Sequence, residues 1–169
     1  VVASEFNDEG DQVYPRKWNH EFIDLPEVTS QHTPTFSSEE VQRIVSSAKG
    51  QYQMLYALLA GTGMRMGEVS GLEIDKHISH DASTIKIQQS VWSGSVQAPK
   101  TRNAMREIDL PSDLALMLRE FIRGRKSGFL FTSRTGEPLC QTNVLKRSLH
   151  PILESMKRQK AGFHAFRRF

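Results

Sequence analysis

Residues 61–72 read GTGMRMGEVSGL. The glycines at the start of this stretch end the buried helix that the apolar residues 51–60 predict, and a short helix is expected over residues 65–72. Turns and close packing explain these glycines better than a nucleotide-binding loop, because Met66 stands where the GxGxxG pattern needs a glycine and no Gly-Lys-Ser/Thr follows. The stretch therefore joins two helices and carries Arg65 between them.

Capping residues and hydrophobic spacing elsewhere in the sequence predict further helices and a small sheet. Ser37 and Glu40 form a capping box, which predicts a helix beginning at about Ser38. Apolar residues alternate with polar ones from Ile85 to Val91 and again around Ile108, which predicts strands of an antiparallel meander. Other helices are expected over residues 38–48, 112–123 and 142–158. We therefore predict an α+β fold that is mainly α: a helical domain with a small three-stranded antiparallel sheet.

The chain is expected to hold one such domain, over residues 35–169. Residues 1–34 contain three prolines and no sustained hydrophobic period, which is typical of a linker or of the tail of a preceding domain. With no apolar run approaching 18 residues and no secretory leader pattern, a soluble, cytoplasmic protein is expected. The lone Cys140 cannot form an internal disulfide and is predicted to be a small core residue.

Charge is distributed unevenly along the sequence. Residues 1–96 carry 7 Lys and Arg against 13 Asp and Glu, a balance of −6, whereas residues 97–169 carry 15 against 6, a balance of +9; together these give the net charge of +3. The second half is where a polyanion such as nucleic acid would bind. Charge runs more often only solvate helix faces, so charge alone suggests nucleic acid without proving it.

Two further stretches match one family pattern in the same order as residues 61–72. Residues 99–111 read PKTRNAMREIDLP, and residues 164–167 read HAFR. The three stretches resemble the TGxRxGEhxxL, KTxxSxRxIxLP and HxxR boxes of the tyrosine site-specific recombinases, the phage integrase family. One departure is Ala104, which stands where that pattern has serine. The short HxxR box is weak by itself, but the ordered set is specific.

The resemblance assigns roles that suit the chemistry of phosphodiester cleavage. Arg65 and Arg167 would hold the scissile phosphate, because guanidinium groups stay charged and bind phosphate bidentately. Lys100 would be the general acid for the leaving oxygen, and His164 would donate to the phosphate or shuttle protons. Glu68 would orient the Arg65 guanidinium or cap its helix.

Arg102 and Arg106 are candidates for DNA binding, with solvation of a strand face equally compatible for each. No metal ion is expected: His77 and His80 with Asp75 and Asp81 imitate a cluster, but we interpret them as exposed polar residues of a loop.

The family's nucleophile is a tyrosine that forms a 3′-phosphotyrosyl link. Tyr14, Tyr52 and Tyr56 all precede the first arginine box, so this polypeptide is expected to end before the nucleophile and not to cut DNA by itself. The resemblance implies a DNA breaking-rejoining fold, a core-binding domain before residue 35, and double-stranded DNA as partner. It further implies a homo-tetramer on two DNA sites in the full-length parent, with no cofactor, no small-molecule substrate and no membrane. A non-catalytic DNA-binding remnant and a type IB topoisomerase-like enzyme are the alternatives.

Overall fold

The computed structural model of the protein describes residues 34–98 and 105–167. Its helices are α1 (Ser38–Ser47), α2 (Gln51–Thr62), α3 (Met66–Ser70), α4 (Ile74–His77), α5 (Ser112–Ile122), α6 (Gln141–Val144) and α7 (His150–Ser155), with a π-helical turn η4 (Leu145–Leu149) and a 3₁₀ turn η5 (Phe163–Arg167). Its strands are β1 (Thr84–Ile87), β2 (Ser90–Trp92), β3 (Ser95–Gln97) and β4 (Arg106–Asp109). Helices predominate and the strands pair antiparallel, which confirms the predicted α+β, mainly α class.

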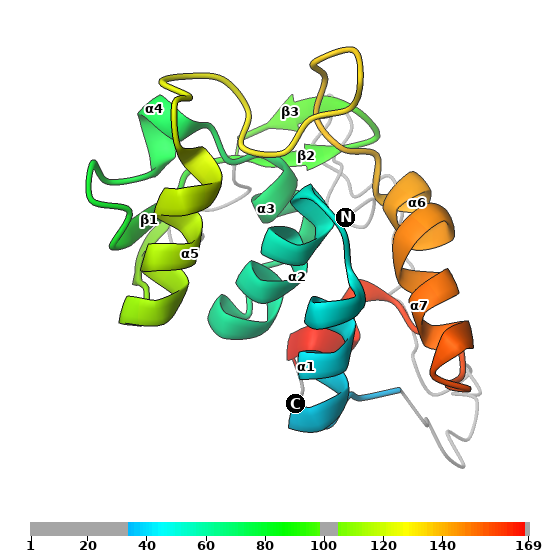
Figure 1. Cartoon of the computed structure of the whole chain (residues 1–169). Helices are drawn as coiled ribbons and strands as arrows, with labels where there is room; N and C mark the ends of the chain where they lie inside the picture. Colours follow the sequence, from blue (N-terminus) through cyan, green and yellow to red (C-terminus); the bar gives the residue numbers. More distant parts are fainter. Residues whose placement is uncertain (1–33, 99–104, 168–169) are drawn as a thin grey trace, which may run out of the picture. The chain divides into compact units, whose positions relative to one another are not determined.

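Helix α2 lies in the middle of the described domain, with α1 and α5 on either side (Figure 1), and the η5 turn packs against it. Its sequence is apolar on most sides, and it buries Met54, Leu55, Tyr56, Leu58 and Leu59. A helix that is apolar all round must be covered by other elements, so α2 forms the centre of the hydrophobic core.

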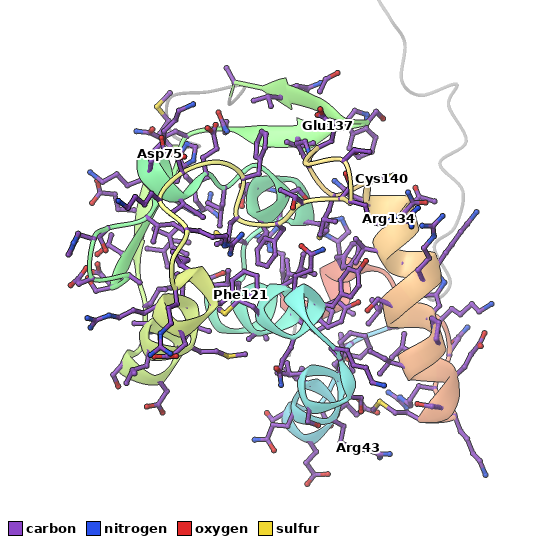
Figure 2. The ribbon with its side chains drawn as sticks, turned by 45° about the horizontal axis from the view of Figure 1, so that its top comes forward. Arg43, Asp75, Phe121, Arg134, Glu137 and Cys140 are labelled. Atoms are coloured by element: carbon purple, nitrogen blue, oxygen red, sulfur yellow. The ribbon has the colours of Figure 1, made fainter. Side chains whose placement is uncertain are left out.

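Helix α1 begins as the sequence predicts. The backbone N–H of Glu40 donates to Ser37 Oγ at 3.3 Å, and the backbone N–H of Ser37 donates to Glu40 Oε2 at 2.9 Å. This capping box satisfies two of the N–H groups that a helix start leaves without partners. Val41 and Ile44 are buried, whereas Arg43 extends outward from the helix (Figure 2).

The strands are arranged differently from the single three-stranded sheet that we expected. β1 pairs with β4 and β2 pairs with β3, giving two separate antiparallel pairs in the described residues. The stretch expected as one strand is interrupted at residues 88–89, where the Gln89 side-chain amide donates to Gly71 O and to Glu73 Oε1, both at 2.8 Å. The chain is thereby tied to the end of α3 before β2 begins.

The predicted helix over residues 142–158 is present as a helical run from Gln141 to Ser155, with the π-helical turn η4 in its middle. Pro151 lies two residues after η4, in the first turn of α7. Proline has no N–H and its ring collides with the carbonyl four residues earlier, so a widened turn relieves a clash that a regular α-helix would suffer. Tyr56 Oη lies 2.8 Å from Ser148 Oγ and links this turn to α2.

The segment before α6 corrects the prediction for Cys140. This residue is exposed rather than a core filler, at the position just before the first turn of α6 (Figure 2). Its neighbour Leu139 takes the buried position instead, with 6% exposure. Among the described residues, no helix is both long and apolar enough to cross a membrane.

Candidate functional site

A cavity of about 810 Å³ lies where α3, the β2–β3 hairpin, the start of α6 and η5 meet. Four residues from the predicted set line it: Arg65, Glu68, His164 and Arg167. The two arginines and the histidine are exposed, whereas Glu68 is buried. Arg65 and His164 therefore border one cavity, although 99 positions separate them in the sequence.

Arg65 is placed at the cavity by the turn between α2 and α3. Gly63 ends α2 with φ of +61°, in the left-handed region that glycine adopts without strain. The next turn leaves Arg65 in an extended conformation at the N-cap of α3, with its side chain 58% exposed. The guanidinium is thus held at the start of a helix and open to the cavity.

Gly67 allows α3 to lie directly against β2. A Cβ atom at this position would be 2.9 Å from the backbone oxygen of Val91, closer than real Cβ contacts approach. Gly71 is similarly close to the chain at Gln89 and Ser90. The structure therefore agrees with the prediction that the glycines of residues 61–72 serve turns and close packing.

Glu68 is the polar centre of the site, with 6% exposure. Its Oε2 accepts hydrogen bonds from the backbone N–H of Arg65 at 2.8 Å and from Arg106 Nη2 at 2.9 Å. Its Oε1 accepts from Arg65 Nη1 at 3.1 Å and from Arg106 Nη1 at 3.2 Å. One carboxylate thus contacts both guanidinium groups and also caps α3, so the two roles expected for Glu68 have matching contacts.

The electrostatics of this cluster favour a bound anion. Burial by itself would raise the pKa of Glu68, but the hydrogen bonds from Arg106 and Arg65 outweigh it and hold the pKa below its ordinary value of 4.5. Glu68 is therefore ionised at neutral pH. Because two guanidinium groups surround one carboxylate, the cluster keeps a net positive charge beside the cavity.

His164 and Arg167 are positioned by the hydrophobic anchor of η5. Phe166 is fully buried, stacked on Tyr56 at 5.5 Å between ring centroids and met edge-on by Phe36 at 5.0 Å. In a 3₁₀ turn, side chains three positions apart lie above one another, so His164 and Arg167 share a face. The apolar residues of η5 point into the core while its two basic residues face the cavity.

Two predicted residues, Lys100 and Arg102, lie outside the residues that the structure describes. Arg106 does not line the cavity; it binds Glu68 from β4. Sequence reasoning missed this pairing, because 38 residues separate Arg106 from Glu68 and no local spacing connects them. Sequence reasoning also missed Trp92, Gln97 and Gln141, which do line the cavity.

We expected the histidine and aspartate residues of the segment 75–81 to be exposed, but one of them, His77, is buried. His77 is 3% exposed, and its Nδ1 accepts the backbone N–H of Glu73 at 2.9 Å. Its burial follows from the short helix α4, which turns this side chain inward instead of leaving it in a loop. No group of three potential metal ligands occurs among the described residues.

The tyrosines of the described residues are not part of the cavity lining. Tyr56 is buried in the core, where desolvation strongly raises the pKa of its hydroxyl despite the hydrogen bond with Ser148. Tyr52 is half-buried on the same helix. Neither hydroxyl therefore lies at the cavity that Arg65 and Arg167 line.

The described domain is a helical α+β unit with small antiparallel sheets and a basic cavity, and its fold has counterparts among solved structures. The Tn1549 transposon integrase in complex with circular intermediate DNA superposes with a TM-score of 0.67 at 19% identity, over 83% of this chain and 53% of that chain. XerA recombinase gives 0.63 at 18% identity, over 85% and 50%. XerH recombinase bound to a palindromic difH substrate, in a post-cleavage complex, gives 0.60 at 19% identity, over 96% and 46%.

Sequence comparison identifies the family. Residues 34–169 match the phage integrase family, and the chain belongs to it. A curated relative, the tyrosine recombinase XerC-like protein of Caldanaerobacter subterraneus subsp. tengcongensis, is 28% identical, with 79% of this chain and 41% of that protein covered. The chain therefore spans about half the length, or less, of the relatives that it matches.

Proposed function

We propose that the protein containing this chain cuts and rejoins double-stranded DNA at specific sites, with the scissile phosphate held in the cavity between Arg65 and Arg167. The observation that carries this proposal is that these two arginines and His164 line one cavity. Membership of the phage integrase family supports the same proposal.

The positive charge of the site suits the transition state of phosphoryl transfer. Negative charge builds on the nonbridging oxygens as a fifth oxygen approaches phosphorus, and fixed guanidinium groups stabilise that charge. By analogy with oxyanion donors, each arginine contributes on the order of 3 kcal/mol to lowering the barrier. His164, on the same face of η5 as Arg167, adds a further donor to the phosphate or a proton shuttle.

The covalent step requires a tyrosine hydroxyl from outside the described residues. Its oxygen gives up a proton, for which His164 or solvent is the acceptor, and forms a bond to phosphorus; the bond from phosphorus to the 5′ oxygen breaks, so the 3′ end becomes linked to tyrosine. The 5′ oxygen leaves as a hydroxyl after accepting a proton, for which Lys100 is the proposed donor. Attack of a 5′ hydroxyl on this link reverses the exchange, and the bond energy is conserved without ATP.

The assembly and location of the whole protein are part of the same proposal. Solved structures of the Tn1549 integrase and of XerH contain DNA, which supports DNA as the partner here. We propose a homo-tetramer acting on two DNA sites in the cytoplasm, with residues 1–34 as a linker from, or the tail of, a core-binding domain that precedes the domain of residues 35–169. Arg102 stays a proposed phosphate contact.

The test is covalent trapping on a nicked suicide substrate, with the full-length protein that contains this chain. Wild-type protein is expected to form a DNA adduct, and Arg65→Ala or Arg167→Ala is expected to abolish it. An exposed arginine on α1, Arg43, offers a matched control whose alanine variant should keep wild-type yield. Normal adduct yield in both site variants would refute the proposal, and relaxation of supercoiled plasmid without partner sites would indicate type IB topoisomerase chemistry instead.

A second candidate is DNA binding without cleavage, which one observation favours: in the described part of the chain, no tyrosine lines the cavity. This candidate predicts salt-dependent DNA affinity, because lysine and arginine contacts with phosphate release counterions. It also predicts that the full-length protein forms no adduct. Affinity that falls with salt, combined with complete absence of adduct, would select it.

A further inference from the structure

We propose that Arg106 is a positioning residue of this site, which directs the Arg65 guanidinium toward the phosphate by occupying Glu68. The inference rests on the proposed function, because the effect of positioning is measured through strand cleavage. It assigns to Arg106 a role distinct from the direct DNA contact that the sequence suggested.

The geometry of the contact is the first argument. The two terminal nitrogens of Arg106 each contact one oxygen of Glu68, at 2.9 and 3.2 Å, which is the parallel two-point arrangement that guanidinium and carboxylate form most strongly. With the two contacts from Arg65, each carboxylate oxygen then accepts two hydrogen bonds. The acceptor capacity of Glu68 is therefore filled, since a carboxylate offers about four lone-pair sites.

The place of Arg106 in the fold is the second argument. It lies on β4 opposite Ile87 of β1, and Ile87 is 3% exposed. The strand pair thus fixes the origin of the Arg106 side chain, which then reaches across to α3. Its side chain is 34% exposed against 58% for Arg65, so Arg106 is the more enclosed partner and Arg65 the one open to the cavity.

Competition for Glu68 connects these observations to catalysis. Arg65 uses one terminal nitrogen for Glu68, at 3.1 Å from Oε1. If Arg106 were absent, two acceptor positions on a buried, ionised carboxylate would lack partners, and the Arg65 guanidinium, which already contacts this carboxylate, could fill them. Arg65 would then turn from the cavity into a two-point contact with Glu68. Arg106 therefore leaves the remaining donors of Arg65 available for the phosphate.

The test uses the full-length protein and measures the single-turnover cleavage rate at saturating DNA, together with DNA affinity at several salt concentrations. Arg106→Ala is expected to slow cleavage by roughly 10- to 100-fold, the range for a misplaced catalytic group. The salt dependence of affinity is expected to stay at its wild-type slope. A phosphate contact would instead lower that slope by about one. An unchanged rate, or a reduced slope with a normal rate, overturns the proposal.

Arg106→Lys is the second variant, and it also serves if the alanine variant does not fold. Lysine keeps the charge but cannot contact both carboxylate oxygens in the parallel arrangement, so at least a roughly tenfold loss of rate is expected. Cleavage at the wild-type rate would overturn the two-point argument. Lys86→Ala is the matched control: it removes the exposed cross-strand pair of Lys86 with Glu107 at 3.1 Å, on the same strand pair, and should leave the rate unchanged.

A double variant tests whether Arg106 acts through Glu68. In a Glu68→Ala background, Arg106→Ala is expected to cause no further loss of rate, and independent losses that multiply would overturn the proposal. Failure of the proposed function is distinguishable, because wild-type protein would then form no adduct at all. Normal wild-type cleavage that requires Arg65 but not Arg106 would refute the positioning role alone.

Discussion

Replacing Glu68 by glutamine perturbs the most connected polar group of the described domain while keeping its size. The amide retains one oxygen that can accept hydrogen bonds, but it puts an N–H₂ group where the second carboxylate oxygen accepted from two donors. That position then holds a donor facing the N–H groups of Arg65 and Arg106. Glu68→Gln should therefore leave two cations close together without the anion that separates them.

The expected cost follows from burial. Removing one partner of a buried, hydrogen-bonded ion pair costs about 3–5 kcal/mol. Glu68 is buried, but the side chains of its partners are 58% and 34% exposed and can regain water. Solvent screening reduces the penalty for such groups, so we expect a loss of about 2–3 kcal/mol in the free energy of unfolding.

Urea denaturation near pH 7, followed by circular dichroism, measures this loss. Glu107→Gln is the control, because the Glu107 side chain is 61% exposed and its ion pair should contribute at most about 1 kcal/mol. The lowered pKa of Glu68 means that its contribution is present above the ordinary value of 4.5 and is lost as pH falls through the folded-state pKa. The difference between wild type and variant should thus shrink in acid. A difference near pH 7 no larger than that of the control would refute the reasoning.

Three further outcomes are expected. Gly67→Ala should lower the melting temperature by several degrees in a thermal scan, because the added methyl group meets Val91 O at 2.9 Å and overpacking costs about 1–3 kcal/mol; an unchanged value would show that α3 can shift without penalty. Burial lowers the pKa of His77, so the unfolded chain takes up a proton first and the unfolding free energy should decline as pH drops below 6.5. His77→Gln should flatten that decline, and a decline that persists in this variant would assign it to another group. Trp92 is 63% exposed and lines the cavity, so DNA should quench a fluorescence signal that Trp92→Phe removes; equal quenching in both proteins would place the DNA elsewhere.

Features encoded by neighbouring residues could be predicted from the sequence. The capping box of Ser37 and Glu40 and the end of α2 at Gly63 depend on residues a few positions apart, and the structure contains them. The first and third sequence boxes supplied Arg65, His164 and Arg167, and these residues line one cavity, whereas Lys100 of the second box lies outside the described residues. Short-range patterns and ordered motifs were therefore sufficient for the outline of the fold and for bringing these three candidates together.

Features that depend on pairing across long distances could not be predicted. The partner of a strand is decided by which faces meet in the folded chain, so alternation around Ile85 and Ile108 indicated strands but not the division into two pairs. The contact between Glu68 and Arg106 depends on that division, because β4 must lie beside β1 to bring Arg106 to α3. His77 was misjudged for the same reason, since its burial is set by what packs on α4.

The anchor of η5 gives the site an unusual vulnerability. In the sequence Phe166 lies between His164 and Arg167, but its ring packs in the interior against Tyr56 and Phe36. Replacing any of these rings by a smaller side chain is expected to tilt η5 and thereby to displace Arg167. A screen for inactive variants should therefore recover substitutions at these interior aromatic positions, although none of them lines the cavity.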